Sequence, residues 1–179
     1  MLVALAAAAA LSACKADHAR YVLRDTPEIT ARFVPVDTGR DWPSHLALGV
    51  HFARTGDTDW FLPWPGGTDD QQNLASTTDV RASGWTPPSP DGGPRPLGDL
   101  MYLAFDAGYR VIDDIPVRGR SAPAHFILPE LGDRAWHADV DRRDSAPKQM
   151  FDLDGRRSRL ACKDLRPSSP GPKERDDPA

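Results

Sequence analysis

The chain has 179 residues, of which 40% are hydrophobic and 27% are charged, and its formal charge is −4. This length and this ratio of hydrophobic to charged residues predict one soluble domain with its own core. The lack of a basic cluster along the chain argues against a nucleic-acid partner. The 18 prolines and 14 glycines interrupt most stretches longer than a dozen residues, which argues against long helices.

The N-terminal residues carry the pattern of an export signal. Leu2 to Leu11 is an uncharged run of ten residues, long enough for the core of a signal peptide and too short to span a bilayer. The tetrapeptide Leu11-Ser12-Ala13-Cys14 ends this run. It resembles the lipobox of bacterial lipoproteins, in which an aliphatic residue and two small residues precede an obligatory cysteine. The resemblance implies cleavage after Ala13 and attachment of a lipid to the sulfur of Cys14.

The lipobox resemblance also implies a location. It predicts a protein held at the membrane of the cell envelope by the lipid on Cys14. Lys15 stands where an aspartate would retain a lipoprotein at the inner membrane, so the periplasmic face of the outer membrane is the expected site. No basic residue precedes Leu2, unlike in most signal peptides. An ordinary cleaved signal, an uncleaved anchor and a plain apolar helix are the alternatives.

The two cysteines of the chain, Cys14 and Cys162, stand near its opposite ends. A disulfide between them would close a long loop and stabilise the fold by roughly 3–5 kcal/mol in the chain-entropy model. Acylation of Cys14 uses the same sulfur, so the lipid and the disulfide exclude each other. An acylated Cys14 would leave Cys162 as an odd thiol, either buried or available for an intermolecular bond.

Composition divides the chain into four parts. These are a signal peptide at 1–13, a lipidated tether at 14–24, a single mainly β domain at 25–145 and a polar, largely disordered tail at 146–179. Short apolar segments separated by turn residues predict an antiparallel sandwich or a small barrel with long Pro- and Gly-rich loops. An α+β build is the alternative.

Several segments of the expected domain carry strand patterns. The strongest is 45–54, where Leu46, Leu48 and Val50 alternate with smaller or polar residues and predict a half-buried strand. A hairpin is expected over 100–115, with its turn at Asp106-Ala107-Gly108. The remaining candidates are strands at 32–36, 60–62 and 125–128, a weaker strand at 136–140, one short helix or strand within 68–80, and a loop over 85–96.

Three of the tryptophans, Trp60, Trp64 and Trp85, are the candidate binding residues. Trp60 and Trp64 flank a short proline-containing segment. Exposed aromatic rings stack on sugars, which would suit contact with a glycan or another component of the cell envelope. Aromatic rings also fill the cores of small β domains, so burial of these three rings is the alternative.

No motif predicts a cofactor, a metal or a catalytic residue. The segment Asp152-Leu153-Asp154-Gly155 comes nearest to a calcium loop but lacks the third ligand and the closing glutamate. His137, Asp139 and Asp141 would share one face of a strand, yet without a further histidine they are incomplete as a zinc site. The sequence also lacks a G-x-S-x-G nucleophile elbow.

The function expected from these observations is that of a lipid-anchored envelope protein that binds another envelope component or serves an assembly. The alternative is an envelope hydrolase that acts on glycan or peptide through Asp and His residues, which the sequence does not specify.

Overall fold

The computed structural model describes residues 14–66, 72–138 and 150–155. Within them, ten strands form one antiparallel sheet in the order β6-β5-β4-β3-β2-β1-β10-β9-β7-β8. A 3-10 turn, η1 (Ala16–His18), and one short helix, α2 (Leu131–Ala138), accompany it. The expected mainly β fold is confirmed. The strands are β1 (Arg20–Leu23), β2 (Thr26–Pro35), β3 (Leu46–Phe52), β4 (Thr58–Pro65), β5 (Gln72–Thr77), β6 (Asp99–Met101), β7 (Leu103–Phe105), β8 (Val111–Ile112), β9 (His125–Ile127) and β10 (Met150–Leu153).

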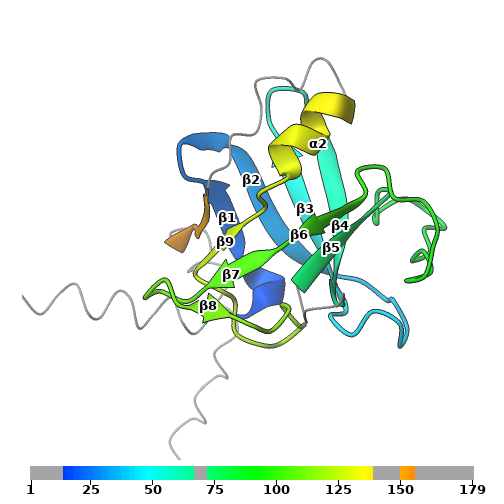
Figure 1. The fold of residues 1–179 in the computed structure, drawn as a ribbon, viewed down its shortest axis with the longest axis horizontal. Coiled ribbons are helices and arrows are strands. Elements are labelled where there is room, and N and C mark those ends of the chain that lie inside the picture. The colour runs from blue at the N-terminus through cyan, green and yellow to red at the C-terminus, as the bar shows by residue number, and fades with distance from the viewer. Residues whose placement is uncertain (1–13, 67–71, 139–149, 156–179) are drawn as a thin grey trace, which may run out of the picture.

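The sheet curls into a half-barrel because its two ends share one stretch of chain (Figure 1). Only Tyr102 separates β6 from β7, yet β6 pairs with β5 at one end of the sheet and β7 pairs with β9 near the other. A flat sheet would hold these two partners many strands apart. Leu100, Tyr102 and Ala104 alternate along this stretch and are all buried on the inner face. Residues 99–105 therefore draw the two ends of the sheet together.

The inner face holds the main core, in which Phe126 of β9 is the central aromatic ring. Its centroid lies 4.8 Å from that of Tyr21 and 4.7 Å from that of Phe151. Phe33 and Tyr102 complete this aromatic group at 6.2 and 5.5 Å from Phe126. Each fully buried ring contributes roughly 1.5–3 kcal/mol relative to an exposed one. Because the rings come from the first and the last described strands, the core needs both ends of the domain.

The outer face carries a second core beneath the Pro-rich residues 78–98. Its buried members are Trp42, Ala47, Trp60, Leu62 and Ala75. The Trp42 indole nitrogen donates to the carbonyl of Pro88 over 3.0 Å, and that of Trp85 donates to the hydroxyl of Thr77 over 3.3 Å. These bonds hold the Pro-rich residues against the sheet. As a result β3, predicted to be half-buried, is buried on both faces over most of its length.

The domain extends beyond both of its predicted bounds. β1 lies within the predicted tether 14–24, β10 lies within the predicted tail 146–179, and the two strands pair with each other. The tether prediction was wrong because Tyr21 and Leu23 supply buried side chains to the inner face. Within the tail, which was predicted to be largely disordered, residues 150–153 form β10. Residues 1–13 and the rest of the tail, 156–179, lie outside the described residues.

Most of the other predicted elements are present. The strands at 32–36, 45–54, 60–62 and 125–128 correspond to β2, β3, β4 and β9, and the undecided segment 68–80 contains β5. The hairpin over 100–115 is confirmed by the pairing of β7 with β8. The weak strand predicted at 136–140 was wrong at 136–138, where the chain is helical. Leu131 and Ala135 are both buried at a spacing of one helical turn, which stabilises α2 on the domain.

Gly49 of β3 generates a first prediction, because a Cβ at this position would lie 2.8 Å from Cζ3 of Trp60. Trp60 is itself buried in the outer core, so its ring has little room to move. We expect Gly49→Ala to lower the free energy of unfolding by about 1–3 kcal/mol, measured by urea denaturation. Gly92→Ala is the matched control, since no atom lies within 4 Å of the added Cβ. Equal stability of the two variants would contradict this packing.

Candidate functional site

A row of paired residues crosses the outer face of the sheet from β1 to β5. The Cα partners are Arg20 with Arg32, Arg32 with Gly49, Gly49 with Trp60, and Trp60 with Thr77. Side chains opposite each other on neighbouring antiparallel strands have Cβ atoms about 4.5–5.5 Å apart. The row therefore places two arginines side by side, next to a glycine whose surface is covered by an indole.

Arg81 brings a third guanidinium group to this row. Its Cζ lies 4.9 Å from the centroid of the Trp60 ring, which is a cation–π contact. Asp79 accepts a hydrogen bond from Nε of Arg81 over 3.2 Å, and this pair restrains the guanidinium group above the ring. The pair is about half exposed, so it contributes more to the position of Arg81 than to stability.

The three arginines and Gly49 line a groove of about 300 Å³, which we call the arginine groove. Its wall contains Arg20, Arg32 and Arg81, together with the hydroxyl residues Thr30 and Thr58, His51, and the acidic residue Asp154. His51 and Thr58 are Cα partners, and Nδ1 of His51 lies 3.2 Å from the Thr58 hydroxyl oxygen. The groove thus offers hydrogen-bonding side chains from several strands.

The charges in the arginine groove are not balanced at Arg32. Partial burial lowers the pKa of Arg32, and the charges of Arg20 and Arg81 lower it further. Within the described residues Arg32 has no ion-pair partner. Like charges placed opposite each other on neighbouring strands are destabilising. An anion in the groove would relieve this repulsion, and guanidinium groups bind phosphate and carboxylate through paired hydrogen bonds.

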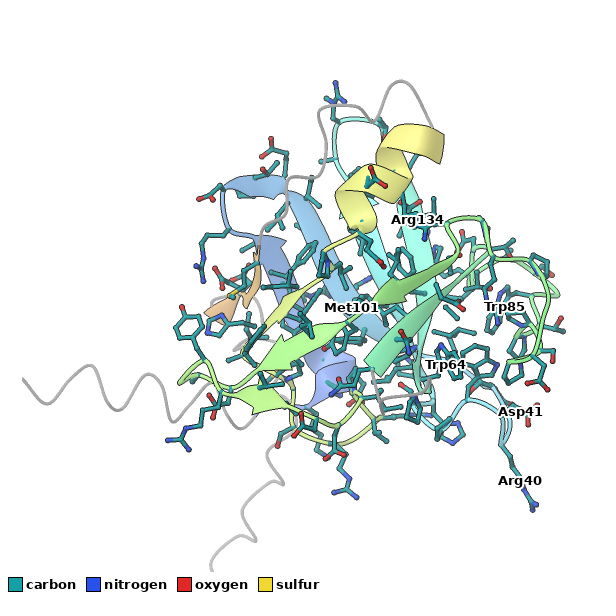
Figure 2. All side chains as sticks on the ribbon, viewed as in Figure 1. Arg40, Asp41, Trp64, Trp85, Met101 and Arg134 are labelled. Carbon is teal, nitrogen blue, oxygen red and sulfur yellow. The ribbon has the colours of Figure 1, made fainter. Side chains whose placement is uncertain are left out.

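The three predicted tryptophans belong to the outer core, and Trp60 also contacts Arg81 of the arginine groove. Trp60 is only 3% exposed, so its ring is a packing element with no open face. Trp64 and Trp85 are partly exposed, and Figure 2 shows them on the same side of the molecule. The indole nitrogens of Trp60 and Trp64 are buried and have no hydrogen-bond partner within the described residues. Of the predicted binding residues, Trp64 and Trp85 therefore retain ring area that a ligand can reach.

Cys14, the predicted lipid-attachment residue, is 3% exposed and belongs to the inner core. It is disulfide-bonded, and the other cysteine of the chain, Cys162, lies outside the described residues. The carbonyl of Cys14 accepts a hydrogen bond from the backbone nitrogen of Ala122 over 2.8 Å. Because a thioether to a lipid would need the same sulfur, the disulfide and the lipid belong to two different states of the chain.

A charged network joins β1, β9 and β10 outside the arginine groove. Arg24 donates two hydrogen bonds to the carboxylate of Asp152, over 2.8 and 2.9 Å, and Nδ1 of His125 lies 2.6 Å from the same carboxylate. The ring of Tyr109 stacks on His125 with centroids 4.6 Å apart. Burial raises the pKa of Asp152, but the hydrogen bonds from Arg24 and His125 outweigh it and leave this pKa below its usual value. The network holds the end of β1, β9 and β10 together, so its role is structural.

The metal sites considered from sequence find no support within the described residues. There, no three side chains of His, Cys, Asp or Glu gather in a way that could hold a metal ion. Asp152, from the nearest match to a calcium loop, is bound to Arg24 and His125. Asp139 and Asp141 lie outside the described residues, so the predicted trio with His137 cannot be placed. None of the helices in the described part of the chain is long and apolar enough to cross a membrane.

The three arginines of the groove were missed from sequence because they are far apart in the chain. The available signal was the position of Arg32 between Ala31 and Phe33, which predicts an outward-facing side chain in an alternating strand. Which residues stand next to it depends on the register between strands, and the sequence does not show that register.

No protein-family model matches this chain, and no curated protein and no solved structure matches it either. Its function is therefore inferred from its own residues.

The state of Cys14 can be measured by thiol labelling of the denatured chain with a maleimide. In the disulfide-bonded state we expect no labelling before reduction and labelling of both cysteines after it. A chain acylated on Cys14 would instead label at Cys162 without reduction. The control is Cys14→Ser, which should show one reactive thiol without reduction. A reactive thiol in the unreduced wild type would contradict the disulfide.

The Asp152 network predicts a loss of stability in acid. Folding lowers the pKa of Asp152. Its carboxylate therefore stabilises the fold at pH values above the unfolded pKa of about 3.9, and this stabilisation is lost as the pH falls through the lower pKa of the folded state. At pH 7 we expect Asp152→Asn to lower the free energy of unfolding by about 1 kcal/mol. Below about pH 4 this difference in free energy between the variant and the wild type should shrink. Chemical denaturation at several pH values measures this.

The matched control for Asp152 is Asp91→Asn. Asp91 is exposed and makes no ion pair within the described residues. The free energy of unfolding of Asp91→Asn should equal that of the wild type at every pH. A difference between wild type and Asp152→Asn that stays constant down to pH 2 would show that this carboxylate does not titrate as described.

Proposed function

We propose that this chain is a binding module of the cell envelope and that its arginine groove binds an anionic group, a phosphate or a carboxylate, on another envelope component. The pairing of Arg20 with Arg32 directly across two strands carries this proposal, since Arg81 adds a third positive charge and Arg32 has no ion-pair partner within the described residues. Such an arrangement costs stability without an anion and binds one well.

An anionic glycan is the partner that best fits the surroundings of the groove. The paired row from Arg20 to Thr77 crosses five strands, which is a span of about 19 Å at the usual strand spacing. Trp85 bonds to Thr77 at the far end of this row and is partly exposed. Because Trp60 and Thr77 are themselves buried, a sugar chain with an acidic group at the arginines would pass over Arg81 to reach Trp85, in keeping with the binding role expected of Trp64 and Trp85.

Export and lipid anchoring through Cys14 belong to the same proposal and are supported by the lipobox resemblance. The burial of Cys14 sets a condition on its acylation, because a sulfur in the inner core is not accessible to an acylating enzyme. Acylation would have to precede the packing of residues 14–19. The backbone bond between Ala122 and Cys14 does not involve the sulfur, so it is compatible with either state.

An envelope hydrolase is the alternative function, and the hydrogen bond between His125 and Asp152 is the observation in its favour. A histidine oriented by a carboxylate is the usual form of a general base. Neither residue lines the arginine groove, and the carboxylate is also bound to Arg24. The binding function is therefore the better supported of the two.

Inorganic phosphate is the probe for the proposed anion site. At ionic strength matched with sodium chloride, we expect phosphate to raise the Tm of the wild type in a saturable way, because it binds the folded state. Arg32→Gln should bind phosphate about tenfold or more weakly, because a charge-assisted hydrogen bond is lost. Without phosphate this variant should be at least as stable as the wild type, because the repulsion among the arginines is reduced.

Arg40→Gln is the control for this titration, since Arg40 is exposed and projects away from the body of the molecule (Figure 2). It should keep the full response to phosphate. If phosphate raises the Tm of Arg32→Gln as much as that of the wild type, the arginine groove is not the anion site.

A further inference from the structure

The arginine groove presents guanidinium groups from two sides. Arg20 and Arg32 stand side by side on β1 and β2. Arg81 lies on the ring of Trp60, a residue of β4. On β3 between them, Gly49 pairs with both Arg32 and Trp60 and brings no side chain of its own. The three arginines and Gly49 line one groove, so a ligand in it has a guanidinium group on either side.

Arg81 keeps hydrogen-bond donors for a ligand. Asp79 accepts from Nε of Arg81 over 3.2 Å and from Nη2 over 3.4 Å, and so occupies one edge of the guanidinium group. Within the described residues, Nη1 of Arg81 has no acceptor. Asp79 therefore holds this side chain in place and leaves the other edge of its guanidinium group for a ligand.

Hydroxyl groups and a histidine add donors beside the arginines. Thr30, His51 and Thr58 are Cα partners across β2, β3 and β4, and all three line the groove. Nδ1 of His51 lies 3.2 Å from the Thr58 hydroxyl oxygen. If Nδ1 donates, the hydroxyl proton of Thr58 stays available, and if Nδ1 accepts, the proton on Nε2 of His51 does. In either tautomer this pair keeps a donor, and the Thr30 hydroxyl makes no hydrogen bond within the described residues.

The acidic residue of the groove wall, Asp154, stands at the Arg20 end. Its backbone nitrogen donates to the carbonyl of Arg20 over 2.7 Å. An anion is repelled by this carboxylate. The favourable position for an anion is therefore away from Asp154, between Arg32 and Arg81.

The arrangement of these donors distinguishes one class of anion from another. A carboxylate has two oxygens in one plane, and a single guanidinium group satisfies both through paired hydrogen bonds. A phosphate monoester has three terminal oxygens in a tetrahedral arrangement and a charge of about −1.5 to −2 at pH 7. It can therefore accept bonds from guanidinium groups on two sides and a further bond from a hydroxyl.

We propose that the arginine groove selects a sugar that carries a phosphate monoester over a sugar that carries a carboxylate. This inference rests on the proposed function, because it names the anion for the same site. Arg32 and Arg81 bind the phosphate from two sides, and the Thr30 hydroxyl donates to its remaining oxygen. A carboxylate in the same place leaves one of the two guanidinium groups without its paired hydrogen bonds.

Glucose 6-phosphate and glucuronate are the matched probes, because they carry a phosphate and a carboxylate at the same end of one sugar. Isothermal titration calorimetry of the full chain, at constant ionic strength and about pH 7.5, measures the Kd of each probe. We expect glucose 6-phosphate to bind about tenfold or more tightly than glucuronate. Equal Kd values, or tighter binding of glucuronate, would overturn the selectivity and leave the anion site in place. Binding of neither probe would overturn the proposed function as well.

Arg81→Gln tests the selectivity from the side of the protein. We expect it to weaken binding of glucose 6-phosphate about tenfold and binding of glucuronate by less than about threefold, because Arg32 alone satisfies a carboxylate. An equal loss of affinity for the two probes would refute the proposal.

Arg95→Gln is the matched control for Arg81→Gln. Arg95 also lies over a tryptophan, with Cζ 5.5 Å from the ring centroid of Trp42, and it also pairs with an aspartate, Asp99. It does not line the groove, so its replacement should leave both Kd values unchanged. The same loss of phosphate affinity in Arg95→Gln as in Arg81→Gln would show that the guanidinium group of Arg81 does not bind the phosphate, and would overturn the proposal.

Discussion

The contact between Trp60 and Gly49 organises the outer face of the sheet. Because glycine has no Cβ, the indole of Trp60 lies directly on β3, where any larger residue would clash with it. On one side the ring joins the outer core, which the Pro-rich residues 78–98 cover. On the other side it borders the arginine groove and carries Arg81 on its face. One ring thus separates the buried part of this face from the polar part.

Each face of the sheet contains a local arrangement that folding alone does not favour. On the outer face, Arg20 and Arg32 stand opposite each other on neighbouring strands. On the inner face, the hydroxyl of Tyr102 is buried without a hydrogen-bond partner among the residues that the structure describes. Natural proteins concentrate such conflicts at functional sites.

The segment that begins at Cys14 connects the proposed anchor to the fold. Cys14, Ala16 and Ala19 are buried, and the carbonyl of Cys14 accepts a hydrogen bond from the backbone nitrogen of Ala122. A lipid on Cys14 would therefore hold this buried segment at the membrane. The disulfide at the same sulfur would instead tie this segment within the folded chain. The lipid proposed for Cys14 and the disulfide therefore exclude each other, because each needs this sulfur.

The sequence by itself determined the mainly β class, because the alternation at 45–54 and the turn residues at 106–108 reflect backbone geometry that is local to the chain. It also singled out Trp60, Trp64 and Trp85, although not which of them would be buried. Only the tertiary structure decided that β1 and β10 belong to the domain, since each finds its partner at the other end of the chain. The tertiary structure alone also brings Arg20, Arg32 and Arg81 to one groove. A residue pattern describes one strand at a time, whereas register and the covering of a face depend on contacts between segments that are distant in the chain.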